Sequence, residues 1–213
     1  MSGASRGAAD LVLSCQPSRA GDRLVFPYSI TNRGSADVYV MDALGGVDAS
    51  GAAKPNTQWV VVLAGPGSDA TVARMIPPLP TDRRIAMPGI PLARRLRQGE
   101  TLEGRIEIPE PLAETSPYFG DLPLRRYEVV AVGGVVLSVG YWSGGSNTLV
   151  AVPTDYAPDH VIVHTADPAR SAHCVSVRLP AQGLQLFRRT DRFPRLAEAT
   201  SPVPVSRPAA AVA

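Results

Sequence analysis

The chain has 213 residues, 45% of them hydrophobic, and a formal net charge of +2. This length allows one large all-β domain or two small ones with a real core. The basic residues stand in pairs and triplets among acids, such as those at 94, 95 and 97, whereas a nucleic-acid binder concentrates them on one face. We therefore expect no nucleic-acid partner. The apolar stretch at 127–142 is broken by glycine and shorter than the roughly 20 residues of a membrane span, so we expect no membrane span.

Proline and glycine punctuate the whole sequence. The 21 prolines and 19 glycines lie scattered between short strand-like runs, which is typical of an all-β protein with many turns. Residues 1–9 lack the apolar run of a signal peptide, so we expect a flexible leader and a cytoplasmic protein. In that compartment Cys15 and Cys174 are expected to be reduced, buried thiols. They would pair only in an exported protein.

The first strands are expected at 11–15, 24–31 and 37–44. Alternation is clearest over 24–31, where every second residue from Leu24 to Ile30 is apolar. Pro27 cannot donate to a β-ladder, so it predicts an edge strand or a bulge. The turn at 32–35 predicts a hairpin that pairs the second of these strands with the third. Residues 45–56 are expected to form a polar loop.

Two further strands are predicted at 58–63 and 71–76. Between them, Gly65-x-Gly67-x-x-Ala70 has the glycine spacing of a dinucleotide-binding loop. Prolines at 77 and 78 leave no room for the helix that such a loop needs, so a hairpin turn is the better interpretation. The region up to Pro91 is expected to be loop. Residues 91–98 are compatible with a short helix or with an extended segment.

Alternation returns at Thr101–Ile108, with its apolar side chains predicted to face the core. Residues 109–123 then form a long proline-rich loop. The stretch 124–142 is expected to be the central hairpin, with a turn at Gly133-Gly134 and both arms covered on both faces. The remaining strands are predicted at 148–152, 160–165, 174–179 and 184–187.

Together these elements predict an all-β fold of one domain, residues 10–196, followed by a disordered tail at 197–213. The strand that ends in Thr31-Asn32, the strand at 34–40 and the turn Leu96-Arg97-Gln98-Gly99-Glu100-Thr101-Leu102 resemble bacterial immunoglobulin-like domains of the intracellular proteinase inhibitor type. The resemblance covers about the first two-thirds of the chain. It implies an immunoglobulin-like β-sandwich, here with appended strands and long Pro-rich loops.

The histidines are the sharpest candidates for a metal site, because His160, His164 and His173 fall in one short segment beside Cys174. On a strand, however, the first two lie about 13 Å apart, too far to ligate one ion directly. The valines and isoleucine between them favour a strand. We therefore expect no metal and no other cofactor, and ordinary histidines.

The loop at 110–123 carries the other candidate groups. Glu110 and Glu114 could form a carboxylate pair for acid–base chemistry, although solvated carboxylates are the simpler interpretation. Leu112, Tyr118 and Phe119 are candidate protein-contact residues, because aromatic side chains on a stiffened loop can anchor a partner. Alternatively the aromatics fold back and close the end of the sandwich. Trp59 and Trp142 are expected to lie in the core.

No recognised catalytic motif is present in the sequence, so we expect no enzyme. The leading hypothesis is a non-catalytic module that binds a protein partner through loops or a sheet edge. One alternative is a proteinase-inhibitor-like protein that uses its long loop. The other is a small metal-dependent hydrolase that uses the histidine segment.

Overall fold

The computed structural model describes residues 10–79, 89–120, 122–144 and 149–191. Strands dominate this part of the chain, and its helical segments are the one-turn η1 (Leu124–Arg126) and α1 (Pro168–Ser171). The prediction of an all-β chain with little helix is therefore confirmed. The expected leader at 1–9 and the expected tail at 197–213 lie outside the described residues.

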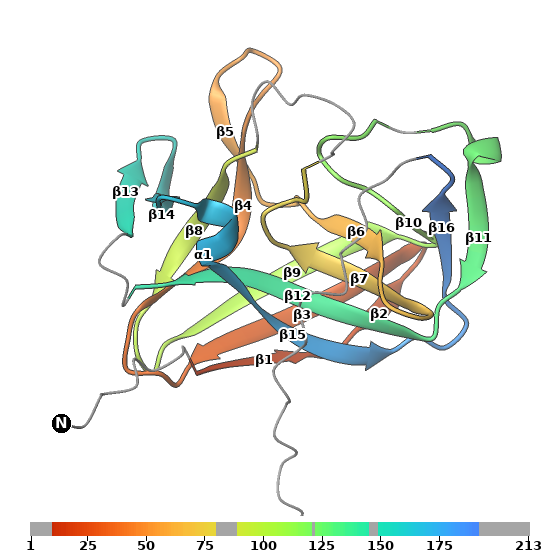
Figure 1. The fold of residues 1–213 in the computed structure, drawn as a ribbon, viewed down its shortest axis with the longest axis horizontal. Helices are drawn as coiled ribbons and strands as arrows, with labels where there is room; N and C mark the ends of the chain where they lie inside the picture. The colour runs from red at the N-terminus through yellow and green to blue at the C-terminus, as the bar shows by residue number, and fades with distance from the viewer. Residues whose placement is uncertain (1–9, 80–88, 121, 145–148, 192–213) are drawn as a thin grey trace, which may run out of the picture.

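A four-stranded sheet forms one layer of the molecule (Figure 1). It contains β1 (Leu11–Cys15), β2 (Ser18–Ala20), β3 (Arg23–Asn32) and β9 (Thr101–Pro109). Strand β3 lies in the middle, with β9 antiparallel along its whole length on one side. On the other side β1 and β2 pair with β3 in a single register, one after the other.

The central position of β3 and its unbroken register with β9 contradict the prediction that Pro27 marks an edge strand or a bulge. Pro27 still has the local effect that its missing N–H predicts. The interruption between β1 and β2, at Gln16 and Pro17, lies opposite Phe26 and Pro27 in the shared register. The ladder on that side of β3 therefore breaks at the proline, while the β9 side supports the strand throughout.

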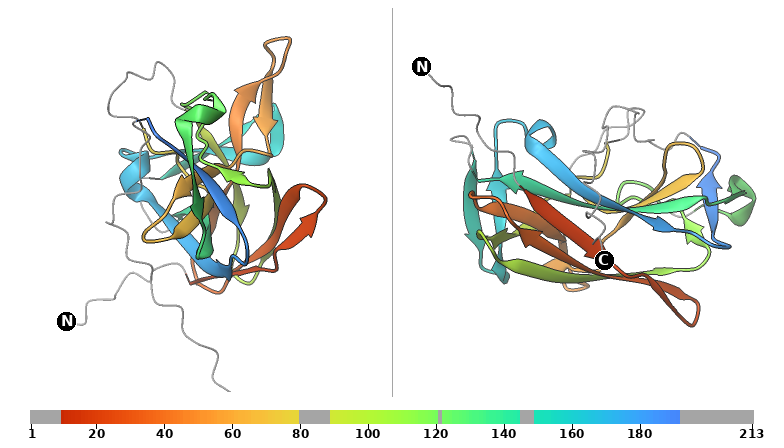
Figure 2. Two further views of the ribbon diagram at one scale, coloured as in Figure 1. Left: turned by 90° about the vertical axis from the view of Figure 1, so that its right-hand side faces the viewer. Right: turned by 90° about the horizontal axis from the view of Figure 1, so that it is seen from below.

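A nine-stranded sheet forms the second layer, and the views in Figure 2 show it stacked on the first. Its strands are β4 (Val38–Val47), β5 (Ala53–Asn56), β6 (Val61–Ala64), β7 (Asp69–Arg74), β8 (Pro91–Leu96), β12 (Gly134–Ser143), β13 (Val150–Thr154), β14 (Ala157–His164) and β15 (Ala172–Pro180). Strand β12 pairs with β15 on one side, and with β7 and then β4 on the other. It is the most extensively paired strand of the fold.

A small sheet lies at one end of the molecule (Figure 1). It contains β10 (Leu112–Ala113), β16 (Gln185–Arg189) and β11 (Tyr127–Ala131), with β16 in the middle. The predicted central hairpin is therefore wrong, because β11 pairs with β16 and β12 belongs to the nine-stranded sheet. At the glycine pair, Val132 N–H donates to Leu184 O (3.0 Å) and Gly133 N–H to Ser68 O (2.8 Å). These bonds lead the chain from one sheet into the other.

The predicted hairpin between residues 24–31 and 37–44 is also wrong. Strands β3 and β4 lie in different sheets, so their apolar faces meet across the core. The buried Asn32 side chain holds the connection, since its Nδ2 donates to the carbonyls of Ala36 (2.9 Å) and Leu96 (3.1 Å). The chain thus arches between the layers where sequence pattern alone suggests a tight turn.

Other local predictions had mixed outcomes. The turn at Gly65–Ser68 does join antiparallel strands β6 and β7, with Gly67 at φ +62°, as the hairpin interpretation requires. Residues 45–56 are not a loop, because β4 continues and pairs with β5 as a projecting hairpin. The extended alternative for residues 91–98 is correct over strand β8.

The main hydrophobic core lies between the two large sheets. Alternate residues of β3 and β9 face it, together with Val135, Leu137 and Val139 of β12. Both tryptophans are buried, at 5% exposure for Trp59 and 1% for Trp142, which confirms their predicted place in the core. Cys15 and Cys174 are free thiols, but Cys15 is only half-buried and Cys174 is exposed, so the expectation that both are buried is wrong. Within the described ranges no helix is long and apolar enough to cross a membrane.

Candidate functional site

The predicted contact residue Leu112 lies inside the small sheet. It belongs to β10, which pairs in parallel with β16 through Leu112–Leu186 and Ala113–Phe187, and its side chain is 1% exposed. Residues 109–123 were predicted to form a plain loop, and this is wrong because they contribute the short strand β10. The side chains of Leu112 and Leu186 both pack in the main core, where each is 1% exposed.

The two aromatic residues of this segment have different surroundings. Phe119 is 7% exposed and packs with Leu44, Trp59, Val61 and Leu63 in a second cluster. The Arg189 guanidinium lies 5.4 Å from its ring centroid. Tyr118 is half-buried, and its hydroxyl accepts a hydrogen bond from Gly89 N–H (3.1 Å). The burial of Leu112 and Phe119 is what the structural alternative predicts, in which the aromatics close the end of the molecule.

Glu110 and Glu114 do not form a carboxylate pair. Glu110 pairs with Arg19 at 2.8 Å on the surface. Glu114 is buried and accepts two backbone hydrogen bonds, from Ala64 N–H (2.8 Å) and Arg189 N–H (2.7 Å). These bonds join β6 and β16 through one side chain, so Glu114 has a structural role between sheets.

The three histidines lie in three different environments. His160 is nearly buried, and its Nε2 lies 3.4 Å from Asp42 Oδ2. His164 is exposed and lies opposite Val150 in the β13–β14 ladder. The His173 ring is 5.5 Å from the Tyr141 ring on the neighbouring strand. Within the described residues no three His, Cys, Asp or Glu side chains come together in a group that could hold a metal ion.

Asp42 is the centre of a buried ionic cluster that sequence reasoning missed. Strand β4 has a bulge here, because Met41 pairs with Ala93 and Ala43 with Leu92, leaving Asp42 as the extra residue. A bulge re-aims a side chain, and the Asp42 side chain is only 9% exposed. Its two oxygens lie 3.0 Å from Arg74 Nη1 and 2.6 Å from Arg94 Nε.

Arg74 connects this cluster to the opposite sheet. Besides Asp42, its guanidinium donates to the Tyr28 hydroxyl (3.1 Å) and to the Arg105 carbonyl of β9 (2.9 Å). The Tyr28 ring lies over Gly104, where a Cβ would come within 2.2 Å of the ring. Burial raises the pKa of Tyr28, which keeps its hydroxyl neutral as a hydrogen-bonding partner. The cluster thereby fixes the spacing of the two layers.

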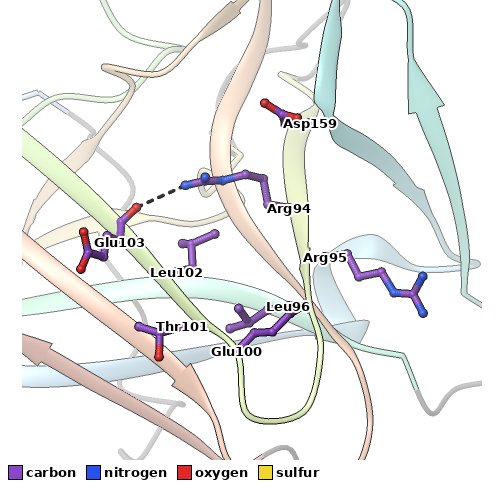
Figure 3. Close-up of a pocket in the computed structure, with 8 residues that line it drawn as sticks. All are labelled: Arg94, Arg95, Leu96, Glu100, Thr101, Leu102, Glu103 and Asp159. Atoms are coloured by element: carbon purple, nitrogen blue, oxygen red, sulfur yellow. Dashed lines mark hydrogen bonds between the residues drawn. The ribbon is translucent and has the colours of Figure 1, made fainter.

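Arg94 links the buried cluster to a surface groove of about 640 Å³. The groove lies where β8 turns into β9, and Figure 3 shows Arg94 reaching across it. Arg94 Nη2 donates to the Glu103 carbonyl (3.3 Å). Glu103 and Asp159 also line the groove, and both are exposed.

The lining of the groove is mainly charged. Its lining holds a single hydroxyl, that of Thr101, and this hydroxyl hydrogen-bonds to Thr31 Oγ1 (2.9 Å). The buried cluster thus joins β4, β7 and β8 through ion pairs. The groove beside it is a charged surface.

Strand β11 forms one edge of the small sheet. Within the described residues β11 pairs only with β16, and Figure 1 shows β11 as the outermost strand at its end of the molecule. Val129 on this strand is 56% exposed and Leu124 just before it is 75% exposed. Val129 lies directly opposite Phe187, whose ring is 6.2 Å from that of Tyr127. The edge thus adjoins a partly exposed apolar surface.

One sequence signal for the ionic cluster was available. Asp42 interrupts the apolar run Val38–Leu44, and Arg74 ends the run from Ala70. A charge inside an apolar strand is rarely buried unless it is paired, so opposite charges in two such strands suggest a buried pair. The open edge of β11 has no such signal, because pairing partners are set by the tertiary fold.

No protein-family model matches the chain, and no curated protein or solved structure matches it either.

Proposed function

We propose that this protein is a non-catalytic protein-binding module that takes up an extended segment of a partner along β11. The observation that carries the proposal is the open edge of this strand beside exposed Val129 and Leu124. A strand at a sheet edge presents unpaired N–H and C=O groups, which another chain can pair with. Main-chain bonds then give affinity, and alternate side chains give specificity.

Other strands with a single partner in the described residues fit this role less well, and β9, one of them, has no exposed large apolar side chain. Strand β13 pairs only with β14 in the described structure and has exposed Val150 and Val152. It contains Pro153, however, which removes a donor from the middle of a prospective ladder. Strand β15 is longer, but β1 lies against it. Strand β11 has no proline over its five residues.

The experiment combines crosslinking with amide protection. A photo-crosslinking amino acid replaces Val129 in the full chain, and a matched variant carries it at Val47, which is 72% exposed on the β4–β5 hairpin. Proteins crosslinked only from position 129 are identified, purified and added to isotope-labelled protein. We expect slower hydrogen exchange at β11 amides in the complex. Val129→Lys is expected to weaken binding and Val47→Lys to leave it unchanged.

Two results would count against this function. Protection that falls outside β11 would move the interface elsewhere. An affinity that Val129→Lys leaves unchanged would show that the edge is not used. No contact among the described residues favours the proteinase-inhibitor or hydrolase alternative in a comparable way.

We also propose that the two large sheets form an immunoglobulin-like sandwich. Two features support this: a core enclosed between facing sheets, and the β3–β4 and β8–β9 connections, which pass from one sheet to the other. An experimental structure with the strand order of that fold would establish it.

A further inference from the structure

We infer that the segment bound by β11 is acidic at the end that lies beside Arg125 and Arg126. This inference rests on the proposed function and adds the chemistry of the partner. Both arginines belong to η1, which leads directly into β11, and both are exposed. An incoming strand must pass them, because they stand at the start of the open edge.

The other charges around this edge already have partners. Arg188 pairs with Glu128 at 2.6 Å, and Arg189 pairs with Asp191 at 3.0 Å. No ion pair to Arg125 or Arg126 occurs among the described residues, although Arg126 helps to lower the pKa of Asp191, after the larger effect of Arg189. Two positive charges are thus left at one end of the edge.

The opposite end of the edge carries no unpaired charge, because Arg178, which donates to Gly133 O (3.3 Å), is paired with Asp69. Strand β11 closes with Val130 and Ala131, and Val132 and Gly133 follow it. A partner that matches this edge therefore has an acidic end beside η1, an apolar residue near Val129 and a neutral far end. Charge complementarity of this kind selects partners and fixes register more than it adds affinity.

We expect the partner strand to run antiparallel to β11. Antiparallel pairs outnumber parallel pairs roughly two- to threefold, and β11 already pairs antiparallel with β16. In an antiparallel arrangement the C-terminal part of the partner segment lies beside the start of β11. The acidic residues are therefore expected in the C-terminal half of the bound segment.

The test uses a phage-displayed library of random dodecapeptides selected on the full chain. Peptides that bind are synthesised and measured against four proteins: the parent, Val129→Lys, the double variant Arg125→Gln/Arg126→Gln, and Arg33→Gln/Arg97→Gln. The last variant loses the same charge from exposed positions in the turns next to β3 and β8, away from β11.

We expect Asp and Glu to be enriched in the C-terminal half of the selected peptides. The Arg125→Gln/Arg126→Gln variant should bind them more weakly, by up to about fivefold for each arginine lost, as for exposed ion pairs. The Arg33→Gln/Arg97→Gln variant should bind like the parent.

The failures of the two proposals can be told apart. Peptides that Val129→Lys releases but that show no acidic bias would overturn the inference and leave strand addition at β11 standing. An acidic bias that survives Arg125→Gln/Arg126→Gln would also overturn it. A selection without enrichment, or with peptides insensitive to Val129→Lys, would count against both.

Discussion

At the scale of single residues, the most consequential position is Asp42. One carboxylate lies between two guanidiniums, and Arg74 is only 4% exposed at its side chain. Buried ion pairs add little net stability compared with apolar residues, but removing one partner leaves an uncompensated buried charge. The bulge places Asp42 in the interior. The buried charges on β4, β7 and β8 therefore depend on one another for compensation.

We expect Asp42→Asn to lower the free energy of unfolding by about 3–5 kcal/mol, the range for breaking a buried pair. Urea unfolding measures this loss directly. Asp37→Asn is the matched control, since Asp37 pairs with Arg95 at the surface. This variant should lose much less of its free energy of unfolding. Equal losses in the two variants would show that burial of the Asp42 cluster does not matter energetically.

A second residue-scale prediction concerns acid stability. Arg178 donates to both oxygens of Asp69, at 2.8 and 2.9 Å, and these hydrogen bonds lower the pKa of Asp69. A lowered pKa in the folded state stabilises the protein above the unfolded pKa of about 3.9. That contribution is lost as the pH falls through the lower folded pKa.

Urea midpoints measured from pH 6 down to pH 2.5 should therefore fall less steeply for Arg178→Gln than for the parent. Lys54→Gln is the control, because Lys54 is an exposed cation on the β5 hairpin. Parallel curves for the parent and Arg178→Gln would contradict the conclusion that Arg178 lowers the pKa of Asp69.

At the scale of elements, the segment from β10 to Phe119 holds the small sheet against the rest of the fold. Glu114 bonds to the backbone of β6 and β16, and Phe119 packs on Trp59 and Leu63. Segments with this much burial form part of the cooperative structure, whereas binding loops come from the low-stability end.

Phe119→Ala is accordingly expected to cost about 3–5 kcal/mol, as for other buried aromatic residues. Tyr118→Phe removes only one hydroxyl, which accepts a bond from Gly89, and should cost far less. Thermal unfolding distinguishes the two. If Phe119→Ala unfolds like the parent and instead weakens partner binding, the segment is a contact surface.

At the scale of the whole molecule, stability is expected to be highest around β12. This strand has neighbours on both sides along most of its length, and Val135, Leu137 and Val139 are at most 1% exposed. Edge strands β11 and β13 have one neighbour each in the described structure.

Native-state hydrogen exchange should thus find the slowest amides in β12 and β3, with exchange that tracks global unfolding. The amides of β11 that point away from β16 and those of the β5 hairpin should exchange by local opening. Comparable protection of β11 in the free protein would mean that its edge is already occupied.

Local patterns were enough to predict most strands. Alternation at 24–31 and 101–108 placed the buried residues of β3 and β9, because the period of two is a property of the strand backbone itself. Glycine and proline also located the β6–β7 turn, because their effect on the backbone dihedral angles is likewise local.

Pairing between strands was not determined locally. The arms at 127–131 and 134–143 look like a hairpin in sequence, yet β11 joins β16 and β12 joins β7 and β15. Any apolar strand can pair with any other, so the choice depends on which faces bury most surface in the assembled layers. The ionic cluster and the open edge of β11 follow from that choice. The sequence by itself therefore determined the all-β class and the core faces of its clearest strands. Only the tertiary structure decided which strands pair, where Asp42 lies and which strands stand at an edge.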